Sequence, residues 1–237
     1  MHKIAFVIPT KDRPIDLRRM LDSLVKQERK PEQIIIVDSS KPNIINVIND
    51  FKKLNIDYTT IYPPSLAKQR NAGMALLNKD ITLAGYLDDD VVLEKDAIKN
   101  MLFFWNNTKS NTGGAVFNII NTPPAKWTRI KSILFLDSPT PGKLLMSGCT
   151  SILGHQKNNI AVDWLCGGAT VWKREVINKY SYDEWFKGTG YLEDVDFSFN
   201  VKNEYELYMV SNAKLAHYSQ PVKTEKYFLL GKWQIFN

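Results

Sequence analysis

The chain has 237 residues, of which 44% are hydrophobic, and its 31 Lys+Arg against 25 Asp+Glu give a formal net charge of +6. This balance excludes a disordered chain, because nearly half of the residues can fill a core, and the length favours one domain over two with unrelated activities. No apolar run approaches the roughly 18 residues that a membrane-spanning helix needs, and two cysteines cannot form a disulfide framework. We therefore expect a cytoplasmic protein.

Strands and helices alternate through the first 110 residues. The runs at 4–8 and 34–37 are apolar throughout, which is typical of strands buried on both faces. Pro14 precedes apolar residues at helical spacing, so a helix is expected between these strands. The same reasoning predicts helices at 44–54, 66–77 and around 97–105, and strands at 57–61 and 81–87. The alternation predicts an α/β fold with a mostly parallel sheet covered on both sides.

The second half of the chain has a less regular pattern of apolar residues. A predicted strand at 115–120 is followed by residues 122–154, which are rich in Pro and Gly and have weak periodicity. We interpret that stretch as a long loop or insertion. Regular secondary structure is predicted again after residue 162, with strands at 169–172, 207–210 and 214–218 and a helix at 192–201.

The surplus of positive charge admits a nucleic acid, a membrane surface or an anionic small substrate as partner. The Lys and Arg residues are scattered rather than clustered with aromatic residues, and no nucleic-acid signature is present. We therefore expect no nucleic-acid partner.

The most informative motif is Asp88-Asp89-Asp90, which directly follows the predicted strand at 81–87. Three adjacent carboxylates repel one another, so an ionised cluster needs a cation or a strong set of donors. In extended backbone Asp88 and Asp90 point to one side and Asp89 to the other. The alternatives are a solvated acidic turn or an N-cap for a helix beginning at Glu94.

Four other features have both a purely structural and a functional interpretation. Glu193 and Asp194 open a predicted helix, where acids also serve as caps. His217 is either a packed imidazole or a ligand. Gly167-Gly168 marks a tight turn or a close approach of a ligand to the backbone, and Arg70 lies on a predicted helix where a surface position is the default.

Taken together and in order, the motifs resemble those of glycosyltransferase family 2, the inverting enzymes of GT-A fold. The resemblance extends from about residue 4 to 218, and it is carried by Val7-Ile8-Pro9-Thr10-Lys11-Asp12-Arg13, Ile36-Val37-Asp38-Ser39-Ser40, Gln69-Arg70-Asn71-Ala72-Gly73, Tyr86-Leu87-Asp88-Asp89-Asp90, Cys166-Gly167-Gly168-Ala169, Tyr191-Leu192-Glu193-Asp194-Val195-Asp196-Phe197-Ser198 and Ala216-His217.

The resemblance implies one GT-A domain over residues 1–220, with a nucleotide-binding half at 1–110 and an acceptor half at 111–220. It implies a nucleotide-diphosphate sugar donor, with UDP or dTDP expected, and a glycan or lipid-linked acceptor. The positions that would bind the donor are Pro9, Thr10, Asp12, Arg13, Asp38, Arg70, Asp88, Asp89, Gly167 and Gly168. Asp38 would accept from a pyrimidine N–H, and the two glycines would form a floor under the sugar.

The resemblance further implies a divalent cation held by Asp90, Asp88 and His217. Oxygen ligands suit Mg²⁺ or Mn²⁺, and the imidazole favours Mn²⁺. Asp194 would be the general base, with Glu193 orienting the acceptor or serving as the alternative base.

Two other functions stay open: a nucleotidyltransferase that makes a nucleotide-sugar, and an inactive nucleotide-sugar-binding module. The tail at 221–237 is also open. Its segment 223–237 mixes lysines with aromatic and aliphatic residues, so it is expected either to contact an anionic membrane or to pack on the core or on a second copy in a homodimer.

Overall fold

We describe a computed structural model of the chain, which covers residues 2–122, 127–187, 190–219, 228 and 231. The predicted tail at 221–237 thus lies almost entirely outside the described residues. The strands are β1 (Ile4–Thr10), β2 (Gln33–Asp38), β3 (Ile56–Thr60), β4 (Leu83–Leu87), β5 (Val91–Leu93), β6 (Thr112–Ile119), β7 (Ile160–Val162), β8 (Ala169–Lys173) and β9 (Glu206–His217). The helices are α1 (Pro14–Val25), α2 (Ile45–Ile48), α3 (Leu66–Ala75), α4 (Ala97–Asn107), α5 (Arg129–Ile133), α6 (Arg174–Lys179) and α7 (Glu193–Lys202).

All nine strands of the described residues belong to one sheet with the order β3-β2-β1-β4-β8-β6-β9-β5, and β7 pairs with β9. The pairs among β3, β2, β1 and β4 are parallel, and so is β6 with β9. Strand β8 runs antiparallel between β4 and β6 and joins the two halves of the chain. The predicted single α/β domain with a central, mostly parallel sheet and flanking helices is confirmed.

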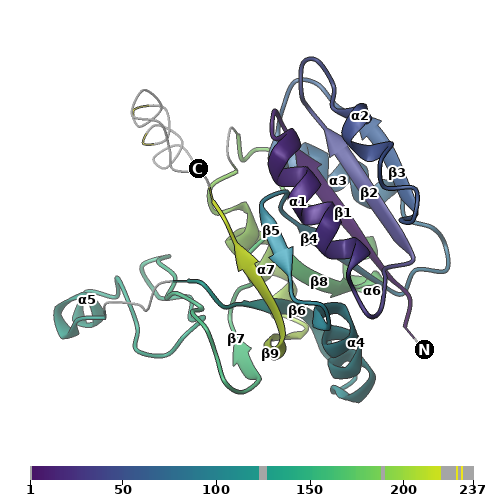
Figure 1. The fold of residues 1–237 in the computed structure, drawn as a ribbon. Coiled ribbons are helices and arrows are strands. Elements are labelled where there is room, and N and C mark those ends of the chain that lie inside the picture. Colours follow the sequence, from purple (N-terminus) through teal and green to yellow (C-terminus); the bar gives the residue numbers. More distant parts are fainter. Residues whose placement is uncertain (1, 123–126, 188–189, 220–227, 229–230, 232–237) are drawn as a thin grey trace.

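Both faces of the sheet are covered because its central strands are apolar throughout. Every residue of β1 and β2 is buried, as expected for strands that lie between two layers of helices. Helix α1 lies in front of the sheet in Figure 1, while α3 and α7 lie behind it. Helix α1 begins with Pro14 in its first turn and buries Leu17, Met20, Leu21 and Leu24, the predicted apolar stripe.

Several boundaries differ from the predictions. The helix predicted at 44–54 is only the four residues of α2, because its apolar residues belong to a succession of turns that cover the sheet edge. Strands β5 and β7 and helices α5 and α6 were not predicted, since each has six residues or fewer and too little periodicity. The strands predicted at 207–210 and 214–218 form the single strand β9, whose register against β6 shifts between them.

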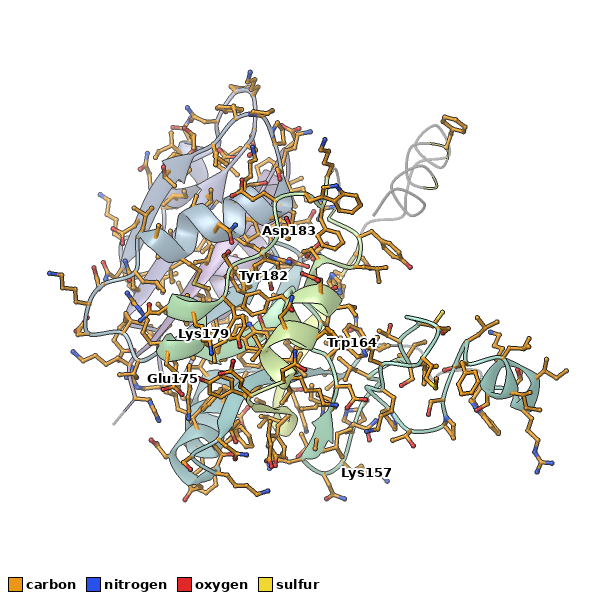
Figure 2. All side chains as sticks on the ribbon, turned by 180° about the vertical axis from the view of Figure 1, so that it is seen from behind. Lys157, Trp164, Glu175, Lys179, Tyr182 and Asp183 are labelled. Carbon is orange, nitrogen blue, oxygen red and sulfur yellow. The ribbon has the colours of Figure 1, made fainter. Side chains whose placement is uncertain are left out.

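The described residues among 122–154 contain little regular structure, as predicted. In their described part, helix α5 and a bridge between Leu144 and Thr150 are the regular elements. This stretch projects away from the sheet in both Figure 1 and Figure 2. None of the helices in the described ranges is long and apolar enough to cross a membrane.

Candidate active site

The polar motifs meet where β1, β2 and β4 end. These strands run parallel, with Thr10 opposite Asp38 in the register of β1 and β2, so their carboxyl ends lie at one edge of the sheet. The three aspartates form the connection from β4 to β5. Strand β5 pairs antiparallel with the end of β9, where Val91 is opposite His217. Open α/β sheets bind ligands at this edge.

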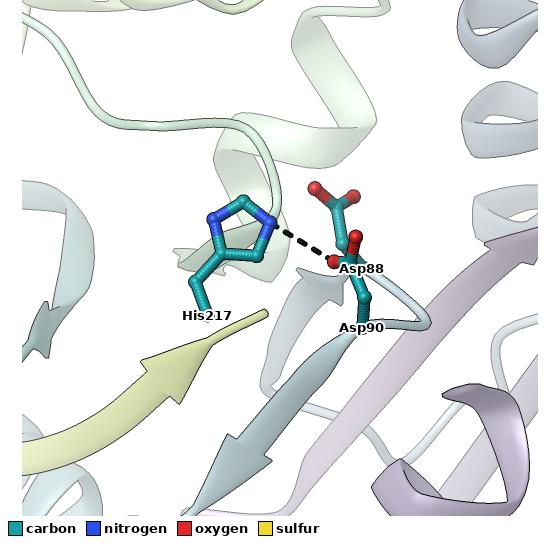
Figure 3. A group of neighbouring side chains, drawn as sticks. All are labelled: Asp88, Asp90 and His217. Carbon is teal, nitrogen blue, oxygen red and sulfur yellow. Dashed lines mark ion pairs between the residues drawn. The ribbon is translucent and has the colours of Figure 1, made fainter. Parts of the chain in front are cut away.

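Asp88, Asp90 and His217 form a cluster that can hold a metal ion. One ligand atom from each lies within 4.8 Å of the others, and Figure 3 shows the three side chains converging from the β4–β5 connection and the end of β9. Asp90 Oδ1 is buried and lies 2.9 Å from His217 Nε2, yet it accepts no well-directed hydrogen bond from a described residue. A buried oxygen left without a donor fits a cation ligand, and two carboxylates with an imidazole fit Mn²⁺ or Mg²⁺.

The charges around Asp90 keep it ionised. Burial acts to raise its pKa, but the contact with His217 and the charge of Arg13 outweigh burial and lower the pKa below its usual value. The same contact with Asp90 raises the pKa of His217. The N-cap interpretation of the three aspartates is wrong, because β5 follows them and α4 is preceded by Asp96 instead.

Asp89 points away from the cluster and into the protein, as predicted, although Asp89 and Asp90 lie in a turn closed by a hydrogen bond from the Val91 N–H to Asp88 O and not in extended backbone. Its carboxylate accepts a 2.7 Å hydrogen bond from Thr10 Oγ1 and a 3.1 Å bond from Arg13. Arg13 also donates to Asp90 at 3.0 Å, so one guanidinium joins the second and third aspartates. Burial raises the pKa of Asp89 to about 7. Thr10 and Asp89 thus bind each other, and both are buried.

Arg70 is buried, and its surface interpretation is wrong. Its guanidinium forms an ion pair with Glu193 and lies 3.5 Å from Asp88. It also lies over two aromatic rings, 5.0 Å from the centroid of Tyr182 and 5.6 Å from that of Tyr86. One buried cation therefore links the β4–β5 connection to the start of α7.

Glu193 and Asp194 occupy the first turn of α7 and have different partners. Asp194 accepts 2.9 Å hydrogen bonds from the backbone N–H groups of Gly167 and Val195. Its pKa is raised by burial, against the hydrogen bond from Gly167 and the charge of Arg70. Burial raises the pKa of Glu193 to about 8, although Arg70 opposes the shift. Of the two, Asp194 is half-buried and Glu193 is fully buried.

Gly167 and Gly168 form the turn that joins these groups. The backbone N–H of Asp88 donates to Gly168 O at 2.9 Å, while Gly167 donates to Asp194. A Cβ at Gly167 would lie 2.6 Å from the guanidinium of Arg70, and a Cβ at Gly168 would overlap the carboxylate of Asp88. Adjacent side chains of the site therefore occupy the space that the two glycines leave.

We expect Gly168→Ala to fold normally but to displace the Asp88 carboxylate, because that carboxylate is the flexible end of a partly exposed side chain. The Michaelis constant for a nucleotide-sugar should rise several-fold with a smaller change in kcat, and steady-state kinetics would measure both. A donor Michaelis constant equal to that of the unchanged protein would contradict the placement of Asp88.

The remaining positions that were predicted to bind the donor lie at the same edge of the sheet. Asp38 is fully buried, and its carboxylate accepts from the N–H groups of Ser40 and Ile44 and from the hydroxyl of Tyr58. Pro9 is buried in β1, opposite Val37. Asp12 is exposed with a φ of 56°, and its N–H donates to Ser40.

Sequence reasoning did not identify two residues at the site. Tyr182 stacks on Phe197 and covers Arg70, but it lies in an irregular segment without a motif. Asn121 holds the backbone of His217 from both sides, accepting from its N–H at 2.9 Å and donating to its carbonyl at 2.8 Å. In the sequence, Asn-Thr-Pro at 121–123 indicates only a turn and does not point to a contact with His217.

Known structures share this fold at low sequence identity. The chain superimposes on TarS 1–349 from S. aureus in complex with UDP-GlcNAc with a TM-score of 0.66 and 14% identity, over 95% of this chain and 61% of that one. It matches the mannosyltransferase PcManGT from Pyrobaculum calidifontis in complex with GDP-Man and Mn²⁺ with a TM-score of 0.64 and 11% identity, over 98% and 60%. It covers 38% of a longer TarS chain. The chain thus spans less than two thirds of the length of these proteins.

No curated protein matches the chain significantly. The model of the family "Glycosyl transferase family 2" matches residues 5–180, a range that includes the β1 motif, the three aspartates, Arg70 and both glycines of the turn. Because this match extends over well more than half of the 237 residues, the chain belongs to glycosyl transferase family 2.

Proposed function

We propose that the protein is an inverting glycosyltransferase that moves a sugar from a nucleotide-diphosphate donor to a hydroxyl of a glycan or lipid-linked acceptor. The observation that carries this proposal is the Gly167-Gly168 turn. One of its glycines is hydrogen-bonded to Asp88 of the metal-binding cluster and the other to Asp194. A donor diphosphate at the cluster would therefore lie beside a carboxylate able to take a proton from the acceptor.

The metal-binding cluster supports the donor side of the reaction. A divalent ion held by Asp88, Asp90 and His217 would neutralise the negative charge that develops on the departing nucleoside diphosphate. The imidazole ligand favours Mn²⁺ over Mg²⁺. The mannosyltransferase of the same fold is in complex with Mn²⁺, which agrees with this choice.

Inversion follows from a single displacement. The acceptor oxygen attacks the anomeric carbon on the face opposite the diphosphate, the new glycosidic bond forms as the sugar–phosphate bond breaks, and the acceptor proton passes to the enzyme. We assign that proton to Asp194, since Glu193 is already paired with Arg70. The backbone N–H groups of Gly167 and Val195 orient the Asp194 carboxylate.

The pH dependence of transfer discriminates between the two carboxylates. A general base acts only when ionised, so the rate falls as the pH drops through its pKa in the folded protein. Burial raises the pKa of Asp194, so the acid limb should lie above the ordinary Asp value of about 3.9. With Glu193 as base, the limb would lie at about 8. We expect kcat/KM, measured from about pH 4 to 9, to be half-maximal at a pH between these two values, and a half-maximal rate at pH 8 would transfer the role to Glu193.

For the donor we propose a uridine or deoxythymidine diphosphate sugar, with Thr10, Asp12, Asp38 and Arg70 around the nucleoside. The TarS structure of the same fold is in complex with UDP-GlcNAc, and the mannosyltransferase with GDP-Man. Thermal-shift screening of nucleotide-sugars with and without Mn²⁺ would identify the donor. Transfer or hydrolysis of the stabilising compound would then separate an active enzyme from an inactive binding module.

We place the reaction in the synthesis of a cell-envelope polysaccharide, at the inner face of the cytoplasmic membrane. The mixture of lysines with aromatic and aliphatic residues in segment 223–237 supports a peripheral membrane contact. A lipid-linked acceptor would make such a contact useful, because the acceptor is confined to that surface.

A further inference from the structure

The described part of residues 120–154, here called the arm, leaves the sheet after β6 and carries an unusual amount of exposed apolar surface. Figure 1 and Figure 2 both show it projecting away from the sheet, with α5 at its far end. Of the eighteen large apolar side chains that are exposed among the described residues, nine lie on the arm: Ile120, Trp127, Ile130, Ile133, Leu134, Phe135, Leu136, Met146 and Ile152. The exposed fractions are 73% for Ile130, 76% for Ile133 and 91% for Met146.

The base of the arm is fixed to the body of the protein, and most of its exposed apolar residues lie beyond that base. Leu153 is buried, and a Cβ at Gly142 would lie within 2.6 Å of the Val162 side chain. Ser151 donates a 2.7 Å hydrogen bond to Thr140 O and accepts one of 2.8 Å from the Lys143 N–H. The packed side of the arm thus faces β7, while its apolar end has no cover from described residues.

The charge on the arm is positive. Residues 120–154 contain four basic residues and one acid, Asp137. Arg129 and Lys131 are exposed on α5, beside Ile130 and Ile133, and neither forms an ion pair with a described residue. Apolar and basic groups therefore share one exposed surface.

Exposed apolar and basic side chains together distinguish among three candidate partners of the arm: a second copy of the chain, a glycan and a lipid bilayer. A second copy of the chain would bring two basic arms together, and like charges oppose that contact. A glycan would stack on aromatic rings, but most of these side chains are aliphatic. A lipid bilayer with anionic headgroups satisfies both features, since aliphatic and aromatic side chains enter the interface while Arg and Lys meet the headgroups. We propose that the arm, through α5 and its flanking residues, binds the surface of an anionic membrane.

The position of the arm relates this surface to the candidate active site. Ile120 donates a backbone hydrogen bond to Leu215, and Asn121 holds the backbone of His217. The first residues of the arm therefore lie beside the proposed metal ligand. Docking of the arm would hold the site at the membrane surface, where a lipid-linked acceptor is found; this consequence rests on the proposed function, whereas membrane binding itself does not.

Co-sedimentation of the full chain with vesicles tests the proposal. Vesicles of phosphatidylcholine with about one third phosphatidylglycerol should bind the protein, vesicles of pure phosphatidylcholine should bind it at least tenfold more weakly, and added salt should weaken the binding. The triple variant Ile130→Ser/Ile133→Ser/Met146→Ser should lose at least tenfold in partition coefficient, and Arg129→Gln/Lys131→Gln should lose the preference for anionic lipid. The matched control Phe103→Ser/Leu76→Ser removes exposed apolar residues outside the arm and should bind as the unchanged protein does.

Three results would overturn the proposal. The first is unchanged vesicle binding by the triple variant, with thermal unfolding showing that it is folded. The second is complete loss of binding on deletion of residues 221–237 with the arm intact, which would place the contact on the tail alone. The third is no binding by the unchanged protein; a dimer in sedimentation velocity that the triple variant dissociates would then assign the arm to a second copy of the chain. None of these results depends on glycosyl transfer.

Discussion

Asp194→Asn is expected to lower the rate of glycosyl transfer by about 10²-fold or more while leaving donor affinity unchanged. The amide cannot accept the acceptor proton as the carboxylate does, yet it has nearly the same size and keeps one oxygen for the N–H of Gly167 or Val195. Single-turnover transfer would measure the chemical step, and calorimetry with the nucleotide-sugar would measure donor binding.

Asp196→Asn is the matched control, because it removes the same charge from the same turn of α7 at a side chain that bonds only to Asn200 among the described residues. It should retain nearly full activity. A loss in Asp196→Asn equal to that in Asp194→Asn would point to a general charge effect at the start of α7, and full activity in Asp194→Asn would remove this residue from the role of base.

Asp90→Ala should abolish metal-dependent binding of the donor. Asp90 contributes the buried oxygen nearest to His217, so its loss leaves one carboxylate and one imidazole in the cluster. A ligand that binds only the folded state stabilises it by RT ln(1 + [L]/Kd), so Mn²⁺ should raise the melting temperature of the unchanged protein and should not raise that of the variant.

A matched control is Asp96→Ala, which removes an acid at the start of α4 without touching the cluster. It should keep the Mn²⁺-dependent rise in melting temperature. Calorimetry that gives equal nucleotide-sugar affinity in Mn²⁺ for Asp90→Ala and for the unchanged protein would rule out the metal assignment.

The sequence predicts those helices and strands whose burial pattern repeats regularly along the chain. The apolar runs of β1 and β2 and the stripe of α1 are examples, because burial on two faces or on one stripe is visible in the order of the residues. Short elements such as β5 depend on a partner far along the chain, in this case the end of β9, and leave no local pattern. The opposite orientation of Asp89 relative to Asp88 and Asp90 agrees with the prediction, but its physical cause is a turn at Asp89-Asp90, which the sequence argument from extended backbone did not include.

The partners of the charged site residues were not predictable from local sequence. Arg70 has a helical neighbourhood that favours a surface position, and only the fold brings it against Glu193, 123 residues further along the chain. The same is true of Tyr182 and of Asn121, whose positions depend on α7 and on the end of β9. The family resemblance already predicts the metal ligands and the base, whereas the ion pair between Arg70 and Glu193 is visible only in the three-dimensional contacts.

The glycines around Arg70 and Glu193 have a consequence for how this site changes during evolution. The guanidinium of Arg70 occupies the space that a Cβ of Gly167 would take, and the Glu193 carboxylate occupies that of Gly190, which also has a φ of +66°. A larger residue at Gly167 is therefore tolerated only when Arg70 becomes smaller, whereas the φ of Gly190 disfavours any side chain there. Loss of one charge of the pair leaves the other buried without its counterion. Stepwise substitution thus passes through unfavourable intermediates, so Gly167, Arg70 and Glu193 should covary among homologues while Gly190 stays glycine.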